Sequence, residues 1–154
     1  MLYCAYGSNM SIEQMAVRCP DSSVVCNGEL HGWEFCFNRH ADIIETEHEE
    51  DIVPVVVWDI CSDEDWASLD MYEGYPNYYD RRGVQVWFED GTSDVAIVYV
   101  MTDNRKGICP PDRKYFDCIV KGATENDIDI MYLYDALDYA YDNETEYNQY
   151  NVKE

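Results

Sequence analysis

Two short segments carry the residue types that could do chemistry in this chain. The first, Tyr6-Gly7-Ser8-Asn9, follows an apolar run at the N-terminus. This arrangement is typical of a strand that ends in a turn and leaves backbone N–H groups free to hold an anion. The second segment places one acid, Glu73, among tyrosines at the expected end of a helix. Together they suggest an anion-binding loop that faces a catalytic carboxylate.

The spacing around Glu73 predicts that its side chain points toward the core. Trp66, Leu69 and Glu73 recur at i, i+3 and i+7, so they share one helical face. Gly74 suits the left-handed turn that ends a helix, and Pro76 prevents continuation. Lost solvation and the negative end of the helix dipole should both raise the pKa of this carboxyl, which suits an acid–base catalyst. The alternative is an exposed helix-end residue or a local cap.

The loop at Tyr6 also has two interpretations. It is either an ordinary strand-to-helix connection, in which Ser8 and Asn9 satisfy local backbone groups, or a substrate cradle. In the second case the N–H groups of Gly7, Ser8 and Asn9 bind a carboxylate or carbonyl without any basic side chain. Ser8 does not lie in a G-x-S-x-G elbow, so we do not expect it to be a nucleophile.

Other kinds of site find little support in the sequence. The three histidines, His31, His40 and His48, have neither a triad context nor the H-E-x-x-H spacing of a zinc site. No glycine-rich nucleotide motif is present. We therefore expect neither a metal nor a cofactor.

Length and composition indicate one domain. The 154 residues can bury most of their apolar surface in a single core, and we assign residues 1–142 to it and 143–154 to a polar tail. Seven cysteines without any C-x-x-C spacing predict reduced, mostly buried thiols. No apolar stretch approaches the roughly 20 residues of a membrane span, and no signal peptide is recognisable, so we expect a cytoplasmic protein without a membrane partner.

Charge restricts the partners further. Ten basic residues against thirty-two acidic ones give a net charge of −22, which opposes binding to nucleic acid or anionic lipid. The same imbalance leaves a non-enzymatic alternative open. An acidic protein can imitate nucleic acid and occupy the basic groove of another protein, or serve as a small-molecule binder.

The coarse pattern predicts an α+β fold. Strands are expected at residues 1–6, 23–29, 33–38, 52–60, 84–88 and 95–101, and helices at 11–19, 62–73, 111–119 and 128–141. We interpret residues 28–32 as a turn region and the acidic run 42–51 as a solvated loop without chemistry. Asp90-Gly91 predicts a hairpin. A small mixed β-barrel with a few flanking helices and a sheet with helices on one side both fit this pattern.

The two segments, taken with others, resemble the gamma-glutamylcyclotransferase family. The resemblance runs from residue 3 to about residue 126. Its motifs are Tyr6-Gly7-Ser8-Asn9, Arg18-Cys19-Pro20, residues 53–58, residues 69–76, Tyr99-Val100-Met101, Tyr115 and Gly122-Ala123.

This resemblance implies both a fold and a reaction. It implies barrel closure and cyclisation of a γ-glutamyl group to 5-oxoproline with release of the free amine. It gives Glu73 the role of general acid/base and Tyr115, after Pro110-Pro111, that of a substrate contact. No cofactor is implied. The Gly-Ser-Asn loop is most similar to members that act on γ-glutamyl amino acids, although members that trim a biosynthetic intermediate remain an alternative. The leaving amine and the oligomeric state stay open.

Overall fold

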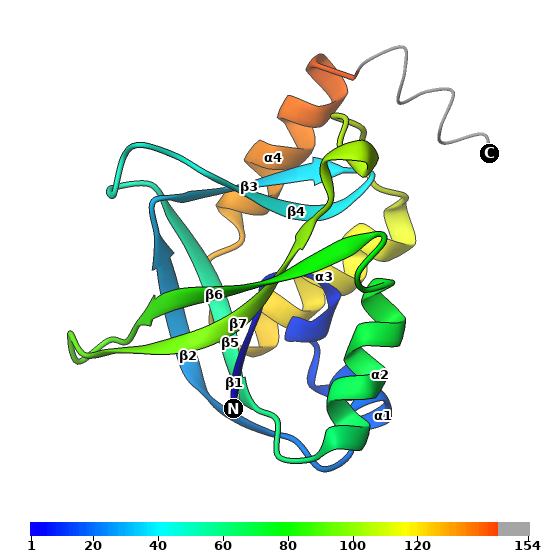
Figure 1. Cartoon of the computed structure of the whole chain (residues 1–154). Helices are drawn as coiled ribbons and strands as arrows, with labels where there is room; N and C mark the ends of the chain where they lie inside the picture. The colour runs from blue at the N-terminus through cyan, green and yellow to red at the C-terminus, as the bar shows by residue number, and fades with distance from the viewer. Residues whose placement is uncertain (145–154) are drawn as a thin grey trace.

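The structure, a computed structural model, describes residues 1–144 and contains a closed five-stranded barrel (Figure 1). Around the barrel the strand order is β1-β5-β2-β6-β7. Neighbouring strands are antiparallel except at the closure, where β1 meets β7 in parallel at Tyr3 and Ile97. The predicted mixed barrel is confirmed. The barrel strands are β1 (Leu2–Ala5), β2 (Ser23–His31), β5 (Ile52–Asp59), β6 (Tyr79–Trp87) and β7 (Ser93–Met101).

A separate hairpin, β3 (Trp33–Asn38) and β4 (His40–Glu45), corrects one prediction. Residues 42–51 do not form one solvated loop, because β4 continues to Glu45. Asp42 has no exposed surface, and its carboxylate accepts hydrogen bonds at 3.0 Å from the Met101 N–H and from the Asn38 side chain. The acidic composition suggested exposure. Strand pairing and two donors instead let the chain bury this acid.

The turn predicted at residues 28–32 is also too long. β2 continues through Gly28, and the chain reverses at Gly32, whose φ is +81°. A Cβ atom at Gly28 would lie 2.5 Å from Cγ2 of Val86. Glycine therefore stands in this strand because the backbone approaches a neighbouring side chain closely, and not because the chain turns.

Side-chain caps begin three of the helices. Ser11 accepts a hydrogen bond from the backbone N–H of Gln14 before α1, Ser62 does so from Asp65 before α2, and Asp112 from Tyr115 before α3. The sequence Ser11-Ile12-Glu13-Gln14 has the spacing of a capping box, but the box is not completed, because the side chain of Gln14 donates to Cys118. The helices are α1 (Ile12–Arg18), α2 (Asp63–Glu73), α3 (Arg113–Glu125) and α4 (Met131–Asp142), with 3-10 turns η1 (Ser8–Met10) and η2 (Asp103–Arg105).

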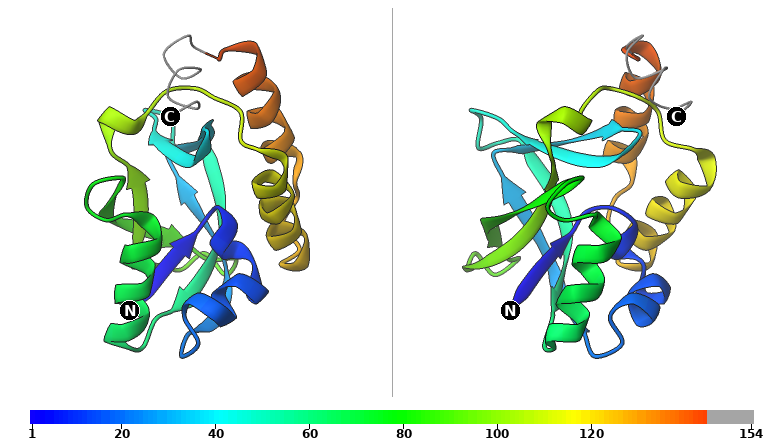
Figure 2. Two further views of the ribbon diagram at one scale, coloured as in Figure 1. Left: turned by 90° about the vertical axis from the view of Figure 1, so that its right-hand side faces the viewer. Right: turned by 45° about the vertical axis from the view of Figure 1, so that its right-hand side comes forward.

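α3 and α4 lie next to each other, with the rings of Phe116 and Tyr134 5.2 Å apart (Figure 2). α1, α2 and α3 lie near β1 and the turn that follows it, whereas α4 packs against β3. In the described part of the chain, no helix combines the length and the apolar character that a membrane crossing requires. The tail predicted for residues 143–154 falls, from residue 145 onward, outside the described residues.

One glycine fixes how α3 meets the turn after β1. A Cβ atom on Gly122 would lie 2.8 Å from the backbone nitrogen of Ser11 and 3.0 Å from the carbonyl carbon of Met10. The side chain of Asn126 adds a hydrogen bond of 2.9 Å to the Met10 carbonyl. The absence of a side chain at Gly122 therefore lets the helix press against backbone atoms next to η1.

Substitution of Gly122 by alanine should destabilise the protein. We expect the overpacked contact to lower the free energy of unfolding by about 1–3 kcal/mol, although alanine favours a helix by roughly 1 kcal/mol. Urea unfolding followed by circular dichroism measures the change. Gly83→Ala is the control, because a Cβ there meets nothing within 4 Å. Equal stabilities of the two variants would show that the Gly122 contact is not tight.

Candidate active site

A cavity of about 320 Å³ lies where the end of β1, the end of α2 and the start of α3 approach each other. Residues far apart in sequence meet there, because the barrel brings the turn after β1 beside the C-terminus of α2. Every site residue predicted from the sequence lines this cavity: Tyr6, Gly7, Ser8, Asn9, Glu73 and Tyr115. The structure thus brings the two segments together around one cavity.

The loop after β1 supplies main-chain donors to one wall. Gly7 precedes η1, and its carbonyl accepts from the N–H of Met10 while that of Ser8 accepts from Ser11. Among residues 1–144, no carbonyl or side chain accepts a hydrogen bond from the N–H groups of Gly7, Ser8 or Asn9. Unpaired N–H groups at the start of a helical turn attract an anion or a carbonyl oxygen.

Glu73 supplies the acid at the opposite wall. It is the last residue of α2, and its Oε1 lies 3.5 Å from the side-chain nitrogen of Asn9. Part of the residue is exposed, but its carboxyl group is buried. Gly74 follows with φ +65° and ends the helix, as predicted, before the cis Tyr75–Pro76 bond. Burial raises the pKa of Glu73 to about 7, and the nearby Arg18 charge opposes that rise. The carboxyl can therefore both accept and return a proton near neutral pH.

Two predicted tyrosines complete the wall in different ways. Tyr6 donates its hydroxyl proton to the carbonyl of Tyr99 at 2.6 Å, so its ring shapes the cavity. The Tyr115 oxygen accepts a hydrogen bond of 3.1 Å from the backbone N–H of Ala41, which leaves its own proton available to a ligand. Burial raises the pKa of both hydroxyls, so both stay neutral.

Several wall residues were missed by sequence reasoning. His40 was noted only for lacking a triad context, yet it lines the cavity, with Nδ1 2.9 Å from the Tyr78 hydroxyl and its ring 5.3 Å from that of Tyr115. Burial lowers the pKa of His40, so it is neutral at pH 7. The tyrosines that flank Glu73 in the sequence could have indicated the tyrosine-rich wall. Nothing near His40 in the sequence pointed to this cavity. The other missed wall residues are Tyr3, Cys4, Ala41, Met71, Tyr72, Gly74, Tyr78, Tyr79 and Tyr99.

The chemistry of this cavity is that of acyl transfer with an acid–base group. Main-chain donors can hold a carboxylate or a developing oxyanion, and a carboxyl across the cavity can move a proton. Within the described part of the chain, no group of three or more histidine, cysteine or acidic side chains is placed to hold a metal ion.

Comparisons with known proteins agree with this geometry. Residues 3–117 match the family model described as gamma-glutamyl cyclotransferase, AIG2-like. A curated human relative, gamma-glutamylcyclotransferase, is 30% identical over 142 residues, which cover 85% of this chain and 74% of the relative.

Solved structures share the fold along almost the whole chain. A structure named gamma-glutamyl cyclotransferase superposes with a TM-score of 0.75 at 25% identity and covers 99% of this chain and 97% of its own. The YkqA protein of Bacillus subtilis gives a TM-score of 0.73 at 19% identity, over 94% of this chain and 55% of that protein. The second likeness supports the fold alone.

The raised pKa of Glu73 should make its replacement stabilising above neutrality. A carboxyl with a pKa of about 7 when folded and about 4.3–4.5 when unfolded stabilises the fold below pH 4, and this contribution is lost as pH rises to 7. We therefore expect Glu73→Gln to raise the free energy of unfolding by about 1–3 kcal/mol at pH 8 and to change it little at pH 4.

Chemical denaturation at both pH values measures this difference. Glu49→Gln removes the same charge from an exposed position in the loop after β4 and serves as the matched control. A Glu73→Gln protein no more stable than Glu49→Gln at pH 8 would argue against a desolvated carboxyl at residue 73.

Proposed function

This chain belongs to the gamma-glutamyl cyclotransferase, AIG2-like family of enzymes, and on that premise we propose that it converts a γ-glutamyl compound into 5-oxoproline and a free amine. The observation that carries the proposal is the position of Glu73. Its carboxyl, with a pKa raised to about 7, borders a cavity whose facing loop presents unpaired N–H groups. Family membership favours this enzyme over the acidic interaction protein considered from the charge.

The reaction needs only a proton carrier and a rigid cradle. The α-amine of the substrate must lose a proton before its nitrogen attacks the γ-carbonyl carbon and closes a five-membered ring. Glu73 accepts that proton. When the bond between the carbonyl carbon and the leaving nitrogen breaks, the protonated carboxyl returns the proton to the departing amine. Neither water nor an oxidant enters the balance.

The loop after β1 holds the glutamyl end in this proposal. The N–H groups of Gly7, Ser8 and Asn9 meet either the α-carboxylate of the substrate or the oxyanion that forms on the γ-carbonyl. The Tyr115 hydroxyl, whose oxygen is fixed by the Ala41 N–H, donates its proton as a second contact. Most of the remaining wall is aromatic and neutral, which suits a substrate held by a few directed hydrogen bonds.

The proposal also specifies the class of substrate and the cellular compartment. We assign the substrate class as γ-glutamyl amino acids, on the likeness of the Gly7-Ser8-Asn9 loop to members with that preference. We place the enzyme in the cytoplasm. The cysteines support this location, since all seven are free thiols in the structure, although Cys61 is exposed and Cys26, Cys36 and Cys118 are only partly buried.

Release of 5-oxoproline from a panel of γ-glutamyl amino acids and γ-glutamylamines tests the proposed function. We expect the wild-type protein to turn over at least one of these compounds, and Glu73→Gln to lose about 10²–10⁴-fold in kcat because glutamine cannot carry the proton. Glu49→Gln should stay within about twofold of the wild type, since its side chain is remote from the reacting atoms. An inert wild type, or an active Glu73→Gln, would refute the proposal.

A further inference from the structure

Arg18, at the end of α1, reaches the loop that lines the cavity without lining the cavity itself. Its Nη1 donates hydrogen bonds to the side-chain oxygen of Asn9 and, at 3.3 Å, to the hydroxyl oxygen of Ser8. The guanidinium lies 3.4 Å from the centre of the Tyr72 ring, one residue before Glu73. This side chain thus joins the two walls that carry the proposed chemistry.

The contact with Arg18 decides which way the Asn9 amide faces. A guanidinium can only donate hydrogen bonds, so Asn9 must present its carbonyl oxygen to Arg18. The amide nitrogen then faces the opposite way, 3.0 Å from the Tyr3 hydroxyl oxygen and 3.5 Å from Oε1 of Glu73. A flipped amide would bring two donors together at Arg18 and two acceptors together at Glu73.

We propose that Arg18 is a positioning residue, which locks the Asn9 amide so that its nitrogen donates to the Glu73 carboxylate as well as to the Tyr3 hydroxyl. The inference rests on the proposed function, and it adds a role that no feature of the sequence assigned to Arg18. Because Arg18 fixes the Asn9 amide, this amide donates to the ionised Glu73 carboxylate from a fixed direction. The Glu73 oxygen that accepts the proton is thereby kept toward the substrate.

The charge of Arg18 acts on the same carboxyl. Burial is the larger influence on the pKa of Glu73, and the positive charge of Arg18 opposes it. Groups that face the cavity from other elements add no full charge at neutral pH. Burial keeps the hydroxyls and the thiol protonated and His40 neutral in this set: Tyr3, Cys4, Tyr6, His40, Tyr79, Tyr99 and Tyr115.

A merely structural arginine would behave differently. Arg18 occupies the last turn of α1, where a cation also stabilises the helix dipole, so its loss could lower stability alone. Loss of the charge alone raises the pKa of Glu73 in either case, and a structural role predicts that this rise and the loss of kcat add to the effects of an Asn9 substitution. The positioning role predicts effects on the pKa and on kcat that do not add, because Arg18 and Asn9 then act on the carboxyl together.

The first test replaces Arg18 by methionine, which keeps an unbranched apolar stem and removes the charge and the donors. The acid limb of kcat/KM for 5-oxoproline release should move up by about half a pH unit or more, and kcat should fall about tenfold or more. Adding Asn9→Ala to this variant should cost little beyond the worse single variant. Full additivity, or an unmoved limb, would overturn the inference.

Two further variants keep the test decisive. Arg18→Lys retains the charge but donates from one point, so we expect its acid limb within about 0.3 unit of the wild type and about a tenfold lower kcat. Arg18→Lys also tests the inference if Arg18→Met does not fold. An unimpaired kcat in Arg18→Lys would overturn the orienting role. Arg113→Met is the control, because Arg113 is exposed at the start of α3 and, among residues 1–144, forms an ion pair with Asp117 alone, at 3.8 Å.

A readout independent of turnover separates this inference from the proposed function. The carbon-13 shift of the Glu73 carboxyl, identified by its absence in Glu73→Gln, reports the pKa directly. An Arg18→Met protein with an unchanged Glu73 titration refutes the positioning role even when the wild type is active. A rise in this pKa that is larger with Asn9 present than in the Asn9→Ala background supports it even when no γ-glutamyl compound is turned over, in which case only the proposed function fails.

Discussion

The desolvation of one carboxyl is the constraint on which the rest of this structure depends. Glu73 ends α2 against a cavity walled largely by neutral tyrosines, so its charged form has few compensating partners. Burial therefore moves its pKa to about 7, where a proton can be gained and lost with little change in free energy. The fold must hold this group in place against its preference for water, as functional sites often require.

A hydrogen-bond network that begins at the cavity wall, at Tyr99, holds the end of α2 in place. Asp70, one turn before Glu73, accepts a hydrogen bond of 2.6 Å from the Tyr99 hydroxyl and one of 2.9 Å from Nε of Arg81. Tyr99 belongs to β7 and Arg81 to β6, so the helix is tied to two barrel strands. A bidentate arginine contact has little freedom to rotate. The position of Glu73 is thereby set by the barrel as well as by its own helix.

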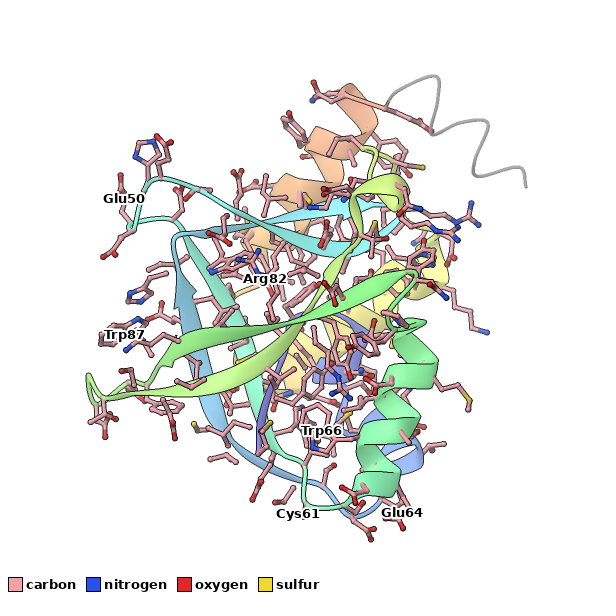
Figure 3. All side chains as sticks on the ribbon, in the orientation of Figure 1. Glu50, Cys61, Glu64, Trp66, Arg82 and Trp87 are labelled. Atoms are coloured by element: carbon pink, nitrogen blue, oxygen red, sulfur yellow. The ribbon has the colours of Figure 1, made fainter. Side chains whose placement is uncertain are left out.

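The strongly acidic composition leaves this site largely unaffected. Many acids lie at the edge of the molecule, such as Glu50 in the loop after β4 and Glu64 near the start of α2 (Figure 3). Screening reduces the effect of exposed charges beyond about 8 Å at physiological ionic strength. Near the cavity, unpaired main-chain N–H groups and the positive charge of Arg18 favour an anion locally. A negative protein can thus offer a local site for an anionic group.

Local signals in the sequence determined the starts of α1, α2 and α3, the hairpin at Asp90-Gly91, and the helix end at Gly74 that places Glu73. Those features depend on caps, turns and periodicity within a few residues, and the structure has them where the sequence predicted them. Only the tertiary structure decided that Asp42 is buried, that Gly28 lies within a strand, and that His40 and Arg18 approach the site. The reason is that burial and contact between distant residues depend on how strands pair and close into a barrel, which no local pattern encodes.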